Sequence, residues 1–154
     1  ERGLRPGTVA THQVVGMGAA CRIAAEQRVE ESARITRLRE RLWLGLSDLP
    51  GVTLNGHPTQ RAPGILSVTA DGVEGESLLY ALPELAVASG SACATTNAEP
   101  SYVLRALGRS DRLAQSSLRL SLGRYSTDDD VDRAVRGIRA AVERLRAVAG
   151  WSAD

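Results

Sequence analysis

Two long helical patterns enclose a middle section of short strand patterns, and this order restricts the chain to a layered fold. The first pattern predicts a helix from about Thr11 to Leu49, with one apolar face and arginines on the others. The second predicts a helix that begins at the capping segment 126–130 and is ended by Gly150, with a buried stripe formed by Val131, Val135, Ile138, Val142 and Leu145. The apolar face of the first helix recurs at steps of three and four residues: Ile35, Leu38, Leu42, Leu46 and Leu49.

The middle section predicts short strands and short helices separated by turn dipeptides such as Asn55-Gly56. Strands are expected at 52–54, 65–70, 85–88 and 117–122, and short helices at 74–82 and 100–107. In 117–122 the leucines alternate with Ser117, Arg119 and Ser121, so one face is apolar and the other polar. The predicted fold class is α+β: three or four short strands packed by two long helices.

Composition excludes several classes of protein. Of the 154 residues 43% are apolar, which excludes intrinsic disorder, and no apolar run approaches the ~20 residues of a membrane-spanning helix. A net charge of +1 and 3% aromatic residues are unlike a nucleic-acid binder. Two cysteines favour a reducing cytosol over a disulfide scaffold. The chain starts without methionine or an apolar leader, and we expect it to be a piece of something longer.

The basic residues restrict the chemistry further. All 19 are arginine, and the sequence contains no lysine. An aldehyde cofactor is held as a Schiff base by a lysine amine. Chemistry of that kind would therefore need a lysine from another polypeptide.

Cys93 is the first candidate site residue. It lies among ten residues, 89–98, none of which has a large apolar side chain, and this composition predicts an exposed, reactive thiol. A buried structural cysteine is the alternative, because free cysteine is among the most buried residue types. Cys21, in the small-residue stretch Gly18-Ala19-Ala20-Cys21, is expected to serve close helix packing.

Arg119 is the second candidate, since a guanidinium on the polar face of a leucine strand suits bidentate binding of a carboxylate. An arginine that faces solvent or forms a structural ion pair is an equal alternative at this stage. Arg124 is a weaker candidate of the same kind. His12 and His57 have no partners at metal-ligand or hydrolase spacing, so neither a zinc site nor a catalytic triad is predicted.

Several segments resemble cysteine desulfurases of the iron–sulfur-cluster assembly type, in the class V aminotransferase family. The segment that ends at Cys93 resembles the family's active-site cysteine segment, and the strand around Arg119 resembles its substrate-arginine strand. The segment that ends at Thr8 resembles the stretch after the cofactor lysine. The matching segments are 1–8, 11–13, 73–78, 89–93, 99–108 and 116–124, in the family's order.

The resemblance implies a fold-type I, pyridoxal 5′-phosphate-dependent homodimer in the cytoplasm that takes sulfur from L-cysteine and leaves L-alanine. Cys93 would be the nucleophile and persulfide carrier, and Arg119 would bind the substrate carboxylate. Thr8 would contact the cofactor phosphate of the neighbouring subunit. The partners implied are a sulfur acceptor or an iron–sulfur scaffold protein. Residues 1–10 would form an extended arm after the cofactor lysine, and 11–154 the small C-terminal domain with a mainly antiparallel sheet.

The sequence departs from the family in three ways. The family's cofactor lysine and the residues that hold the cofactor ring lie upstream of the segment that matches Glu1, so we expect this chain to be inactive alone. Ala94–Asn97 replaces a more serine-rich run, and Gly64 stands where an asparagine is expected.

Two functions follow from this reading. The first is the C-terminal part of a cysteine desulfurase that acts together with its cofactor domain. The alternative is a stand-alone, non-catalytic persulfide carrier or assembly module without a cofactor, which would need neither Arg119 nor Thr8. A selenocysteine lyase or a generic aminotransferase of the same superfamily fits the cysteine segment less well.

Overall fold

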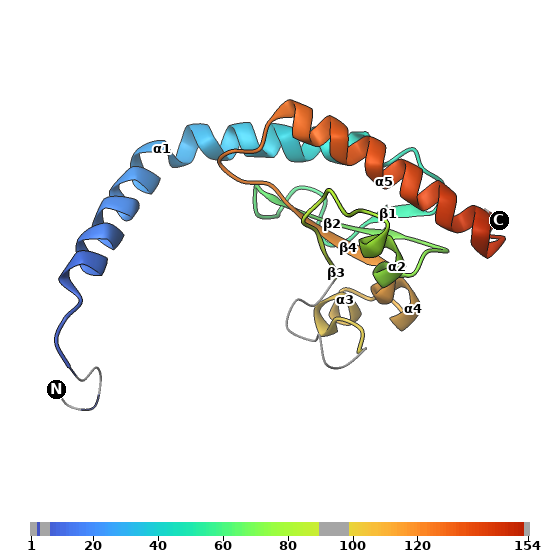
Figure 1. The fold of residues 1–154 in the computed structure, drawn as a ribbon, viewed down its shortest axis with the longest axis horizontal. Helices are drawn as coiled ribbons and strands as arrows, with labels where there is room; N and C mark the ends of the chain where they lie inside the picture. Colours follow the sequence, from blue (N-terminus) through green and yellow to red (C-terminus); the bar gives the residue numbers. More distant parts are fainter. Residues whose placement is uncertain (1–2, 4–6, 90–98, 153–154) are drawn as a thin grey trace.

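Two long helices lie on one side of a small antiparallel sheet (Figure 1). The computed structural model describes Gly3, residues 7–89 and residues 99–152. The helices α3 and α4 lie on the opposite side of the sheet (Figure 1). The elements are α1 (Thr11–Leu44), β1 (Val52–Leu54), β2 (Ile65–Ala70), α2 (Gly75–Tyr80), β3 (Ala88–Ser89), α3 (Tyr102–Ala106), α4 (Asp111–Gln115), β4 (Ser117–Ser121) and α5 (Asp128–Ala149).

The sheet has the strand order β1-β2-β4-β3, and every neighbouring pair is antiparallel. β2 and β4 pair along five positions, with Ser67 opposite Arg119 and Val68 opposite Leu118. The short β3 pairs with the other edge of β4, with Ala88 opposite Arg119. This architecture confirms the predicted α+β class with a mainly antiparallel sheet.

The hydrophobic core lies between the sheet and the two long helices. Leu66 and Val68 of β2 and Leu118 and Leu120 of β4 are buried on this face. The apolar faces predicted for both long helices cover them, with Leu38, Leu42, Leu46, Leu49, Val131, Ile138 and Val142 buried. No helix among the described residues is long and apolar enough to cross a membrane.

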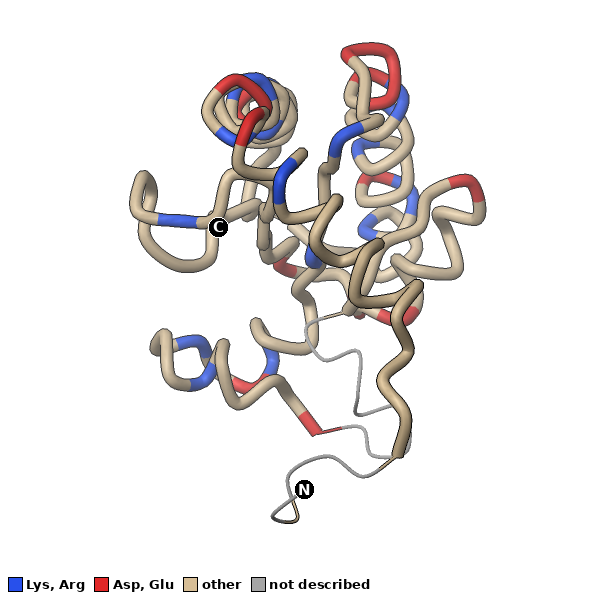
Figure 2. Tube along the Cα trace, turned by 90° about the vertical axis from the view of Figure 1, so that its left-hand side faces the viewer, with Lys and Arg blue, Asp and Glu red and all other residues tan. Residues whose placement is uncertain are grey.

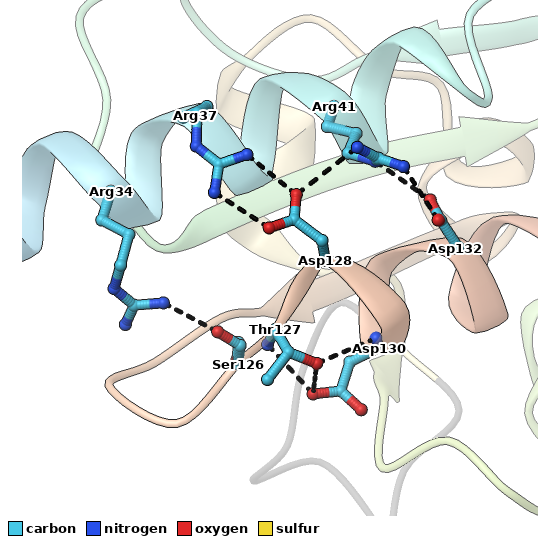
Figure 3. Close-up of polar contacts among 8 residues, drawn as sticks. All are labelled: Arg34, Arg37, Arg41, Ser126, Thr127, Asp128, Asp130 and Asp132. Atoms are coloured by element: carbon cyan, nitrogen blue, oxygen red, sulfur yellow. Dashed lines mark hydrogen bonds and ion pairs between the residues drawn. The ribbon is translucent and has the colours of Figure 1, made fainter.

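Ion pairs join α1 to the start of α5 (Figure 3). Asp128 accepts hydrogen bonds from both terminal nitrogens of Arg37, at 2.8 and 3.0 Å, and from Arg41 at 3.4 Å. Arg41 also binds both carboxylate oxygens of Asp132, at 3.0 and 2.8 Å. The hydrogen bond from Arg37 and its positive charge hold the pKa of Asp128 below the usual aspartate value.

Basic and acidic residues are interspersed along the trace rather than gathered by sign (Figure 2).

Replacing Asp128 with asparagine is expected to lower the urea midpoint of unfolding at pH 7 and to lower it by less near pH 3. The folded-state pKa of Asp128 lies below its ordinary value of 3.8, so its stabilising effect is present above that pH. The effect is lost as the pH falls through the folded-state pKa. Asp129→Asn is the matched control, because Asp129 is exposed in the same helical turn. A loss for Asp128→Asn that is equal at both pH values would contradict the ion-pair explanation.

Three sequence expectations are corrected by the structure. The first helix ends at Leu44, and residues 45–49 form turns although Leu46 and Leu49 stay buried. The strand expected at 85–88 is shifted, because Leu85 and Val87 donate turn hydrogen bonds to residues before them and pairing with β4 starts only at Ala88. The helix α4, five residues long, was not predicted.

Gly64 lies where the chain enters β2, against the end of β4. Its carbonyl accepts a hydrogen bond from Leu122 N at 2.8 Å. A Cβ atom at Gly64 would lie 2.3 Å from the backbone oxygen of Leu122, closer than such atoms can approach. The close strand contact therefore explains why glycine stands where an asparagine was expected.

Gly64→Ala is expected to destabilise the chain by about 1–3 kcal/mol, the usual cost of an added methyl group in a tightly packed site. The clash is with backbone, so it cannot be relieved by rotation of a side chain. Gly123→Ala, at a position where an added Cβ meets nothing within 4 Å, should have little effect. Equal urea midpoints for Gly64→Ala and the parent chain would disprove the close contact.

Candidate functional site

The face of the sheet opposite the long helices is polar. On β4, Leu118 and Leu120 point into the core, and Ser117, Arg119 and Ser121 lie on the other face, as the alternation predicted. On β2 the side chains of Ser67 and Thr69 share that face with Arg119, because the two strands pair in register. Thr69 and Ser117 are completely buried near α4, whereas Ser67 and Arg119 are half-buried. Polar groups therefore run from a covered end of this face to a more open one.

On this face, Arg119 is the arginine for which the described residues provide no partner. Its side chain is half-buried, and it makes no hydrogen bond or ion pair with the described part of the chain. The other described arginines that are buried or half-buried all donate to a backbone carbonyl or a side chain: Arg34, Arg39, Arg61, Arg109, Arg139 and Arg146. A half-buried guanidinium without an anion is unfavourable, so this arrangement fits a carboxylate ligand better than a structural ion pair.

A strand neighbour links Arg119 to the chain segment that contains Cys93. Ala88 of β3 lies opposite Arg119, and Ser89 lies opposite Leu118. The sequence then runs from Ser89 into 90–98. Cys93 itself is outside the described residues, so its predicted exposure stays a prediction. The described residues bring the strand before Cys93 directly beside the strand that carries Arg119.

A buried polar cluster lies next to Arg119, and sequence reasoning missed it. We call Asn55, Ser67, Thr69, Arg109 and Ser117 the Asn55 cluster. Asn55 Nδ2 donates to the hydroxyls of Ser67 at 3.1 Å and Ser117 at 3.3 Å. Asn55 Oδ1 accepts from Thr69 Oγ1 at 3.0 Å and Arg109 Nε at 2.7 Å. All four hydrogen-bonding positions of the buried amide are occupied, which fixes its orientation.

The Asn55 cluster ties several elements to the polar face. Arg109 follows α3 and also donates to the carbonyl of Leu54 at 2.7 Å. The hydroxyl of Ser117 donates to the carbonyl of Leu113 in α4 at 2.8 Å. Sequence reasoning assigned Asn55 to a turn with Gly56. The period-two hydroxyls at 67, 69 and 117 were the available sign of a polar face.

Thr8 is not brought together with Arg119 within this chain. Thr8 is exposed and precedes α1, and the start of α1 projects away from the sheet (Figure 1). The first twenty residues of α1 are nearly all exposed. A shared site for Thr8 and Arg119 would therefore need a second subunit or another arrangement of the arm.

Three other residues considered in the sequence analysis are placed by the structure: Arg124, His57 and Cys21. Arg124 binds both carboxylate oxygens of Glu31 on α1, at 2.9 and 2.8 Å, so its guanidinium is engaged. This hydrogen bond and the charge of Arg124 lower the pKa of Glu31. His57 Nδ1 accepts from the backbone N–H groups of Thr59 and Gln60 within a turn. Cys21 is exposed, so the close packing expected for it does not occur within the described residues.

No metal site is formed by the residues that the structure describes. They contain no group of three or more His, Cys, Asp or Glu side chains that could hold an ion.

Solved structures share this architecture. A NifS-like protein from Rickettsia africae aligns with a TM-score of 0.79 at 23% identity, over 91% of this chain and 37% of that protein. A second NifS-like protein aligns with a TM-score of 0.72 at 28% identity, over 96% of this chain and 35% of the other. The fold is therefore that of one part of a NifS-like, fold-type I transferase.

The sequence identifies the family. The profile described as Aminotransferase class-V matches residues 1–134, and the chain belongs to this family. It is 57% identical over 148 residues to the cysteine desulfurase IscS of Methylococcus capsulatus, and 56% identical over 146 residues to that of Aeromonas hydrophila. These alignments cover 96% and 95% of this chain but only 37% and 36% of the relatives. The chain thus spans little more than a third of the length of the relatives it matches.

Proposed function

We propose that this chain is the C-terminal part of a pyridoxal-phosphate-dependent cysteine desulfurase. The observation that carries the proposal is Arg119, a half-buried guanidinium without a described partner on an open polar sheet face. Its neighbour strand β3 leads into the segment that contains Cys93. An arginine on a rigid strand suits orientation of an amino acid by its carboxylate.

In the proposed reaction Arg119 binds the carboxylate of L-cysteine and Cys93 takes its sulfur. The thiolate of Cys93 forms an S–S bond to the substrate sulfur, and the Cβ–S bond of the substrate breaks. The electron pair of that bond stays on the substrate carbon, which gains a proton to give L-alanine, and Cys93 is left as a persulfide. When bound, pyridoxal phosphate supplies the electron sink that makes this bond cleavable.

The residues of this chain fit only part of the cofactor-dependent site. The guanidinium of Arg119, which has no partner among the described residues, fits a substrate carboxylate, and the exposed position of Thr8 fits a hydroxyl offered to the phosphate of a neighbouring subunit. The chain has no lysine for the covalent bond to the cofactor. The lysine must come from the part of the enzyme that this chain does not cover, and we expect no activity from the chain alone.

The proposal extends to the setting of the complete enzyme. We place it in the cytoplasm as a homodimer that passes sulfur to an acceptor or an iron–sulfur scaffold protein. Two cysteines in 154 residues fit a reducing compartment. The projecting start of α1, which is nearly all exposed, fits an exchange of contacts between subunits (Figure 1). Within this proposal, residues 1–10 form the arm and 11–154 the small domain.

A non-catalytic persulfide carrier is not favoured. Such a module binds no substrate carboxylate, so it would not need the half-buried Arg119. The match to cysteine desulfurases also extends over nearly the whole chain.

The test is sulfide release from L-cysteine in the presence of pyridoxal phosphate and a reductant. The complete enzyme that contains this chain should release sulfide catalytically, and the purified 154-residue chain should release none above the cofactor-only blank. Absence of sulfide from the complete enzyme would disprove the proposed function. Sulfide from the chain alone would disprove the requirement for an external lysine.

A further inference from the structure

The hydroxyl of Ser67 is the polar group beside Arg119 whose proton has no acceptor among the described residues. Ser67 on β2 and Arg119 on β4 are paired residues of an antiparallel ladder. Side chains at such positions share a face, and their Cβ atoms lie about 4.5–5.5 Å apart. Both side chains are half-buried. An anion that meets the guanidinium of Arg119 on this face therefore comes within reach of Ser67.

The hydrogen bond from Asn55 determines which hydrogen-bonding role is left to the Ser67 hydroxyl. Asn55 Nδ2 donates to Ser67 Oγ at 3.1 Å, so this oxygen acts as an acceptor toward the Asn55 cluster. The orientation of the amide is fixed, because its oxygen accepts from Thr69 and Arg109. The Ser67 hydroxyl has one proton left to donate. No acceptor for this proton is found in the described parts of the chain.

We propose that Ser67 is a second carboxylate-binding residue, which donates its hydroxyl proton to the same α-carboxylate that Arg119 binds. Asn55 is then a positioning residue, because its amide nitrogen directs that proton toward the ligand. The inference rests on the proposed function, and it adds a donor from β2 to the one from β4. Two donors from paired strands would fix the plane of the carboxylate as well as its position.

The test is direct binding of L-alanine and of ethylamine, which lacks the carboxylate, to the complete cofactor-loaded enzyme by calorimetry. Ser67→Ala should raise the Kd of L-alanine about tenfold, the loss expected for one hydrogen bond to a charged group. The Kd of ethylamine should stay within twofold. Ser121→Ala is the matched control, because Ser121 lies on the same face of β4 but is exposed and pairs with Ile65. Ser67→Thr, which keeps the hydroxyl, should restore most of the affinity.

The variant Asn55→Asp tests whether the amide of Asn55 directs the hydroxyl proton of Ser67 toward the ligand. The carboxylate would accept from Ser67 where the amide donates, so the hydroxyl would turn away from the ligand. This variant should weaken L-alanine binding as much as Ser67→Ala, and the double variant should show no further loss. Circular dichroism checks that the fold is kept, and if it is not, Ser67→Ala decides alone.

The outcomes separate this inference from the proposed function. An unchanged Kd of L-alanine in Ser67→Ala overturns the role of Ser67, and so does an equal loss for ethylamine. Tight binding in Asn55→Asp with an intact fold overturns the positioning role of Asn55. A parent enzyme that binds L-alanine but releases no sulfide from L-cysteine disproves the proposed function alone. A parent enzyme that binds no L-alanine overturns the carboxylate site itself.

Discussion

Cys93→Ser in the complete enzyme should lower sulfide release from L-cysteine by at least about a thousandfold, as removal of a nucleophile does in other enzymes. A serine hydroxyl does not ionise near neutral pH and cannot carry a transferable sulfur atom. A cysteine thiol can ionise to the thiolate, and the thiolate can carry the sulfur. The substitution changes one atom, so the fold and L-cysteine binding should persist. The expected result is therefore a loss of kcat with little change in the affinity for the substrate.

The chain offers a matched control for this substitution. Cys21 is its other cysteine and is exposed on α1, far in sequence from the site. Cys21→Ser should keep the parent rate. Mass spectrometry after a single turnover should show one added sulfur on the peptide with Cys93 and none on the peptide with Cys21. Sulfide release at the parent rate by Cys93→Ser would remove Cys93 from the mechanism, and added sulfur on Cys21 would assign the carrier role to that residue instead.

The periodic parts of the fold could be predicted from the sequence. Leucines at steps of three and four residues predicted the core face of α1, and alternation predicted the two faces of β4. Both patterns arise from burial of one side of a regular element, so they are visible along the chain. The helix α4 has only five residues, too few for a period, and the position of β3 depends on where β4 can accept a partner.

The polar face could be predicted only in part. Alternation predicted that Arg119 lies on the face opposite the leucines, but whether it has a partner depends on which acidic groups the fold brings near it. Arg124 illustrates the difference, since it looked similar in sequence and pairs with Glu31 across 93 positions. The Asn55 cluster was missed for the same reason, because it joins residues of β2 and β4 to Asn55 after β1 and to Arg109 after α3, which are brought together only by the fold.

Arg119→Lys should raise the KM for L-cysteine about tenfold or more, and Arg119→Ala should raise it further, because each removes charge-assisted hydrogen bonds to a carboxylate. Lysine keeps the charge but replaces a planar fork by a single ammonium group, so it cannot hold both carboxylate oxygens in one plane. The effect on kcat tells whether the fork also orients the substrate. If it only binds, kcat stays near the parent value; if it orients the Cβ–S bond, kcat falls as well.

The control is another arginine that has no partner among the described residues. Arg136 on α5 is exposed and, like Arg119, forms no ion pair in the described ranges 7–89 and 99–152. Arg136→Lys should leave KM and kcat unchanged, because the planar guanidinium of an exposed arginine without a ligand makes no contact that the substitution would remove. If Arg119→Lys also left both constants unchanged, the half-buried guanidinium would not be a carboxylate site, and the polar face would have to be explained by another anion. A rise in KM in the Arg119 variants but not in Arg136→Lys would instead place Arg119 of β4 in the substrate-binding site.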